Sequence, residues 1–113
     1  MNILVSLTVS SLAILITSYL LPGIHIGDFL TAVILAVILG IINTVLKPIL
    51  VIFTLPINIL SLGLFTLVIN AFLILLAAKI VSGFYVDGFW WALLFSIVLS
   101  IINSFLNSLA KKN

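Results

Sequence analysis

The side chains that could do acid–base or metal chemistry are few in this chain, and they lie near the ends of long apolar runs. There is one histidine, His25, and there are two aspartates, Asp28 and Asp87, while glutamate and cysteine are absent. His25 and Asp28 could meet in one short turn, but no third group and no nucleophile turn accompanies them. Without cysteine, thiolate metal sites are excluded. The sequence therefore predicts no catalytic residues, no metal site and no cofactor.

Three asparagines, Asn43, Asn70 and Asn103, lie inside apolar runs. An unpaired amide is costly in hydrocarbon, so we expect each to hydrogen-bond across helices and to contribute roughly 0.5–2 kcal/mol. Ser100 shares a helical stripe of small and polar residues with Asn103. Such stripes let two helix backbones pack closely, which matters because lipid provides no hydrophobic driving force for helices to associate. The alternative is that several bundles assemble and the stripes line a wet path.

Lys47 is the charge whose role depends most on local structure, because Pro48 follows it. If the second helix ends at Lys47, the ammonium group reaches the membrane interface by snorkelling. If the helix continues to Leu55, the charge lies inside an apolar run and becomes a candidate for function. We favour snorkelling.

Lipid must be the solvent for most of this chain. Its 113 residues are 65% hydrophobic and 5% charged, with a mean hydropathy of +1.62, whereas soluble domains carry about a quarter charged residues. Four lysines against two aspartates make no basic patch, so nucleic acid is not an expected partner. We predict a membrane protein that is not an enzyme, whose partners are the lipid bilayer and other copies of itself, with no identifiable small-molecule substrate.

Four membrane spans are predicted, since a spanning helix needs about 20 apolar residues. Two short turns complete the hairpins, and Asp28 and Asp87 are expected to cap the helices that follow them. The predicted spans are Ile3–Leu21, Phe29–Leu46, Leu60–Val81 and Phe89–Leu109.

The segment between the second and third spans is apolar but carries Pro48 and Pro56. We favour a helix that continues through a kink at Pro48 to Leu55, with a tight turn at Pro56–Asn58. The alternative is a re-entrant segment, whose backbone N–H and C=O groups would have to be hydrogen-bonded by protein or water.

The sequence repeats itself after 60 residues: Gly23, Phe29, Ala32 and Asn43 recur as Gly83, Phe89, Ala92 and Asn103. Each repeat holds two spans, so both copies cross the membrane in the same direction, about an axis along its normal. We predict an all-α integral membrane four-helix bundle forming one domain over residues 1–113. Two parallel helical-hairpin repeats, about 3–46 and about 60–109, are joined by the Pro-interrupted apolar segment 47–59.

The lysines predict the orientation. Lys47, Lys111 and Lys112 share one side and Lys79 lies on the other, which gives N-in and C-in by the positive-inside rule. Aromatic residues at the outer ends then form an interfacial belt. The belt includes Phe84, Tyr85, Trp90 and Trp91.

Two motifs, Asn-x-x-x-basic-Pro and Leu-Pro-x-x-x-Leu-x-Leu-Gly-x-Phe, resemble the hallmarks of the small bacterial four-helix phage-holin-like membrane proteins, the YvlD-like family. The resemblance covers nearly the whole chain. The matching positions are Asn43, Lys47, Pro48, Leu55, Pro56, Leu60, Leu62, Gly63 and Phe65.

The resemblance implies a multi-pass protein of the bacterial cytoplasmic membrane, and the holin label implies an oligomeric pore or permeability protein. The alternative is a non-conducting structural or envelope-stress protein that binds lipids or membrane partners. The chain carries only Lys111-Lys112 where many phage holins have a long charged tail, which speaks against lytic activity.

Overall fold

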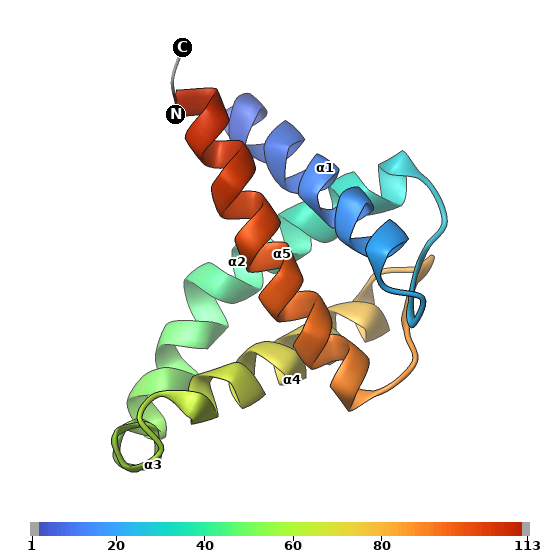
Figure 1. Cartoon of the computed structure of the whole chain (residues 1–113). Helices are drawn as coiled ribbons and strands as arrows, with labels where there is room; N and C mark the ends of the chain where they lie inside the picture. Colours follow the sequence, from blue (N-terminus) through green and yellow to red (C-terminus); the bar gives the residue numbers. More distant parts are fainter. Residues whose placement is uncertain (1–2, 112–113) are drawn as a thin grey trace.

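The computed structural model describes residues 3–111, which form five helices and two short strands (Figure 1). Three helices are long and apolar enough to cross a membrane, and α4, with 17 residues, is shorter. The protein is mostly helical, as predicted, while Lys112, part of the predicted basic tail, lies outside the described residues. The elements are α1 (Ile3–Leu20), β1 (Ile24–Ile26), α2 (Phe29–Phe53), α3 (Leu55–Leu60), α4 (Leu64–Ile80), β2 (Phe84–Val86) and α5 (Phe89–Lys111).

The four long helices pack in a ring, in which α1 and α4 each contact both α2 and α5. In Figure 1 the four helices lie together at the end that carries the strands; away from it, α2 and α4 run to α3, while the other ends of α1 and α5 lie apart from α3. Burial follows this shape: the buried residues of α2 end at Ile42, those of α4 begin at Ile69, and those of α5 end at Ser96. We call the two ends the strand end and the splayed end.

The turn between α1 and α2 and the turn between α4 and α5 pair with each other as antiparallel strands, which an all-α prediction did not include. Ile24 lies opposite Val86, His25 opposite Tyr85 and Ile26 opposite Phe84. β-branched and aromatic side chains favour such extended backbone. Two further hydrogen bonds flank the strands, from the Gly27 N–H to the Gly83 carbonyl at 3.0 Å and from the Asp87 N–H to the Gly23 carbonyl at 2.9 Å.

The strands cover the apolar core, with Phe84 at its centre. Phe84 is fully buried and its ring centroid lies 5.5 Å from that of Phe95. Its predicted place in the interfacial belt is therefore wrong, because the alternation along β2 turns Phe84 inward and Tyr85 outward. Tyr85 and Trp90 are exposed, whereas Trp91 is half-buried. The Trp91 indole occupies the space into which a Cβ on buried Gly23 would project.

The Pro-interrupted segment is helical almost throughout. α2 continues through Lys47 and Pro48 to Phe53, as the favoured interpretation required. The tight turn predicted at Pro56–Asn58 is wrong: Pro56 lies in the first turn of α3, where a missing N–H costs no helical hydrogen bond. The chain reverses instead at Leu62 and Gly63, both with positive φ.

Asn58 fixes this reversal. Its Nδ2 donates to Thr54 Oγ1 at 3.0 Å, and its Oδ1 accepts from Thr66 Oγ1 at 2.8 Å. Its backbone carbonyl accepts from the Gly63 N–H at 2.7 Å. Because the side chain is buried and both ends of its amide are bonded, Asn58 ties α3 to the start of α4.

Candidate functional site

A polar chamber with a cavity volume of about 70 Å³ lies between the middle turns of α2, α4 and α5, where the buried core gives way to the splayed end. Asn43 and Lys47 lie one helical turn apart on α2, and Ser96 and Ser100 do the same on α5. Asn70 comes from α4. The structure thus brings together four of the residues singled out from the sequence, Asn43, Lys47, Asn70 and Ser100, and adds Ser96.

Lys47 is the only charged side chain on the chamber wall. It is partly buried and lies well inside α2, which continues past it to Phe53, so the premise of a helix end at Lys47 does not hold. Among residues 3–111 the one ion pair is His25–Asp87, at the opposite end. Within residues 3–111 the Lys47 ammonium group therefore has no ion-pair partner, and an intramembrane charge of this kind is a candidate for function.

The asparagines do not form the interhelical hydrogen bonds expected of them. Within residues 3–111, no hydrogen bond joins the side chains of Asn43, Asn70 or Asn103 to another residue. The Oδ1 of Asn103 is buried without a partner, a state that costs about 1–3 kcal/mol if nothing satisfies it. Water or a second copy of the chain must supply the missing donor.

A second groove separates α1 from α2 at the same end. It has a volume of about 600 Å³ and its polar lining consists of Ser6, Ser10 and Thr44, with Gly40 between them. A Cβ built on Gly40 would meet no atom within 4 Å. The surface of α2 around Gly40 is therefore open in a single copy, whereas Ala32 and Ala36 on the same helix are buried.

The charged groups at the strand end have structural roles. His25 Nε2 lies 3.1 Å from both carboxylate oxygens of Asp87. Asp28 caps α2, as predicted, by accepting 2.8 Å hydrogen bonds from the N–H and hydroxyl of Thr31. These bonds, the backbone one first, hold the pKa of Asp28 below its usual value. The expected meeting of His25 with Asp28 is replaced by the pair across the two strands.

The long apolar helices agree with the sequence comparison, which finds a membrane-protein family. Residues 1–105 match the family described as "Mycobacterial 4 TMS phage holin, superfamily IV". The chain belongs to this phage-holin family. The resemblance inferred from its two motifs is confirmed, and the protein is a membrane protein of a family that is not a known enzyme family.

Two relatives of this holin-family protein are similar over most of its length. The uncharacterized membrane protein YvlD of Bacillus subtilis is 39% identical over 100 residues, which cover 88% of this chain and 84% of YvlD. An uncharacterized protein of Streptomyces coelicolor is 46% identical over 83 residues, which cover 70% of this chain and 66% of that protein. No solved structure matches the chain.

The residues of the two family motifs lie in two places: at the polar chamber, and in α3 with the chain reversal after it. Asn43 and Lys47 line the chamber, while Pro48 lies beside them on the exposed side of α2. Pro56 and Gly63 shape α3 and the reversal after it. No motif in the sequence points to Asn58, although its spacing of four residues from Thr54 is typical of a side-chain contact on one helical face.

Proposed function

We propose that several copies of this protein assemble in the bilayer and that the polar walls of their splayed ends form a water-filled permeability path. The observation that carries this proposal is the exposure of polar and small residues along the splayed halves of α2 and α5. Lipid cannot hydrogen-bond such groups, so neighbouring copies or water must cover them. The exposed positions are Gly40, Asn43, Thr44, Ser100, Ser104 and Ser108.

We further propose that each copy is one domain of two parallel hairpin repeats, about 3–46 and about 60–109, related by a two-fold axis along the membrane normal. Equivalent hydrogen bonds support this arrangement: Gly27 to Gly83 becomes Asp87 to Gly23 after a shift of 60 residues. The packing of α1 on α2 likewise has its counterpart in that of α4 on α5. α4 then acts as the fourth span despite its length.

The charge on the path is that of Lys47. Both aspartates of the chain lie at the strand end, near its two strands, so no carboxylate offsets the ammonium group in the chamber. A ring of such lysines favours anions over cations in a pore. The proposed path is therefore anion-preferring.

Leakage from vesicles tests the proposal. Full-length protein reconstituted in phospholipid vesicles should release a trapped small anion, and Gly40→Leu and Ser100→Leu should reduce the rate by about tenfold, because bulk at the interface between copies costs roughly 1–3 kcal/mol. Both variants should stay folded, since Gly40 meets nothing within 4 Å. Ile101→Leu, at a neighbouring exposed position, is the matched control.

The size of the assembly should be measured on the same samples by crosslinking in the bilayer. A smaller assembly for Ser100→Leu, together with slower release, supports the proposal. Wild-type vesicles that retain the anion at every protein density would contradict it and would favour a non-conducting role in the membrane.

We also propose that the protein lies in the bacterial cytoplasmic membrane with the splayed end inside. The lysines Lys47 and Lys111 lie at or toward that end, and positive charge is retained on the cytoplasmic side. A reporter fused after Asn113 should be active in the cytoplasm, and one inserted at Ser82 should be active in the periplasm. The reverse pattern at both sites would show the opposite orientation.

A further inference from the structure

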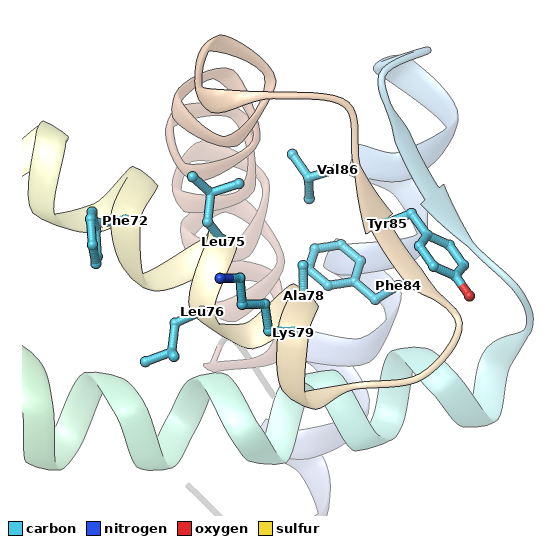
Figure 2. Close-up of a pocket in the computed structure, with 8 residues that line it drawn as sticks. All are labelled: Phe72, Leu75, Leu76, Ala78, Lys79, Phe84, Tyr85 and Val86. Carbon is cyan, nitrogen blue, oxygen red and sulfur yellow. The ribbon is translucent and has the colours of Figure 1, made fainter.

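A groove at the strand end lies between α4 and β2, and it shares no lining residue with the polar chamber. It has a volume of about 450 Å³, and apolar side chains line most of it. Figure 2 shows Leu75 on one side and Val86 on the other, with the Phe84 ring below Val86 and next to Ala78 in this view. The Lys79 ammonium group lies between Leu75 and Leu76, turned back along α4 toward Phe72. The groove therefore combines an apolar trough with one positive charge.

Lys79 has no anionic partner among residues 3–111, where the one ion pair is His25–Asp87. A second copy of the chain could not readily supply one. Of its two aspartates, Asp28 accepts hydrogen bonds from Thr31 and Asp87 is held by His25. An amphiphile with an anionic head group pairs with the Lys79 ammonium group and fills the apolar groove with its hydrocarbon chain.

We propose that this groove binds one anionic phospholipid, with its phosphate on Lys79 and one acyl chain along Leu75 and Leu76 toward Phe72. The distance along α4 from Lys79 to Phe72 is about 10 Å at 1.5 Å per residue, enough for the upper part of an acyl chain. Tyr85 and Trp90, 63% and 73% exposed, lie at the same end, where aromatic residues mark the head-group level. A lysine at this level attracts anionic lipids.

The chain contains its own comparison for this site. Sixty residues earlier, Tyr19 occupies the position that corresponds to Lys79, and a groove of about 400 Å³ is lined by Tyr19, Ile24 and His25. A phenol there carries no positive charge at neutral pH. Only the groove at Lys79 should therefore distinguish anionic from zwitterionic lipid, and this inference does not depend on whether the protein conducts.

Native mass spectrometry of the full-length protein in mild detergent tests the site, with phosphatidylglycerol or phosphatidylcholine added. Wild-type protein should retain phosphatidylglycerol about fivefold better than phosphatidylcholine, the preference expected of one lysine near a membrane surface. Lys79→Met should lose this preference and Lys79→Arg should keep it. Tyr19→Phe and Lys47→Met, matched substitutions outside the groove, should also keep it.

Three results would overturn the proposal: no preference in the wild type, a preference that survives Lys79→Met, or one that Lys47→Met removes equally. An excess of inorganic phosphate should not displace the lipid, and displacement would identify a free-anion site instead. Leu75→Trp, which fills the trough and leaves the charge in place, should reduce retention of both lipids. Unchanged retention in Leu75→Trp would contradict the acyl-chain placement even if Lys79→Met failed to fold.

Discussion

Gly23→Ala should prevent formation of the native bundle or lower its stability by about 3 kcal/mol or more, toward the upper limit of overpacking effects. A Cβ at Gly23 would overlap the indole ring of Trp91. The backbone at Gly23 cannot move away freely, because its carbonyl accepts the Asp87 N–H at 2.9 Å. Thermal unfolding in detergent, followed by circular dichroism, measures the loss.

Gly27→Ala is the matched control for this prediction. The nearest atoms to a Cβ at Gly27 are 3.9 Å away, an ordinary contact, so this variant should unfold near the wild-type temperature. Trp91→Leu combined with Gly23→Ala should recover part of the lost stability, because the smaller side chain vacates the space. A wild-type unfolding temperature for Gly23→Ala alone would show that α5 does not pack against β1 as described.

Lys47→Glu should reverse the ion preference of the proposed path, and Lys47→Met should remove it. With a tenfold salt gradient across a bilayer, ideal selectivity corresponds to a reversal potential of about 59 mV, and we expect the wild type and Lys47→Glu to have opposite signs. The cause is the position of Lys47 as the only charge on the chamber wall. This expectation replaces the near-silent effect that a snorkelling lysine would have.

Lys79→Met is the control, since it removes the same charge from the opposite end of the molecule and should leave the reversal potential unchanged. A reversal potential that Lys47→Met does not alter would contradict the role of Lys47 while leaving the path itself in place. Absence of conductance in every variant would contradict the path.

The helices could be predicted from the sequence because apolar runs of sufficient length have few other folds in lipid. The strands could not: each has three residues, too short for a periodic pattern, and each is stabilised by a partner 60 residues away. The error at Phe84 has the same cause. An aromatic residue next to a span predicts a place in the interfacial belt, but the position of Phe84 in β2 turns its ring into the core. The prediction of a turn at Pro56 is wrong because a proline is equally suited to the first turn of a helix.

The candidate site was predictable in part. The spacing of Asn43 and Lys47 places them on one face of α2, whatever its tertiary contacts. That Asn70 and Ser96 join them depends on how α4 and α5 cross α2, which the sequence does not encode locally. The hydrogen bonds expected across helices from the three asparagines are absent among residues 3–111, although Asn43 and Asn70 line the same chamber. Such bonds depend on the crossing geometry of the helices, which residue type alone does not determine.

The separation of the strand end from the splayed end has a consequence for how the protein can vary. Phe84 and Phe95 pack together in the buried core, whereas Asn43 and Lys47 are not among its buried residues. We therefore expect substitutions at Asn43 and Lys47 to cost less stability than substitutions in the core. Under the proposed function, related chains can therefore change the residues that line the path while keeping the packing that holds the scaffold together.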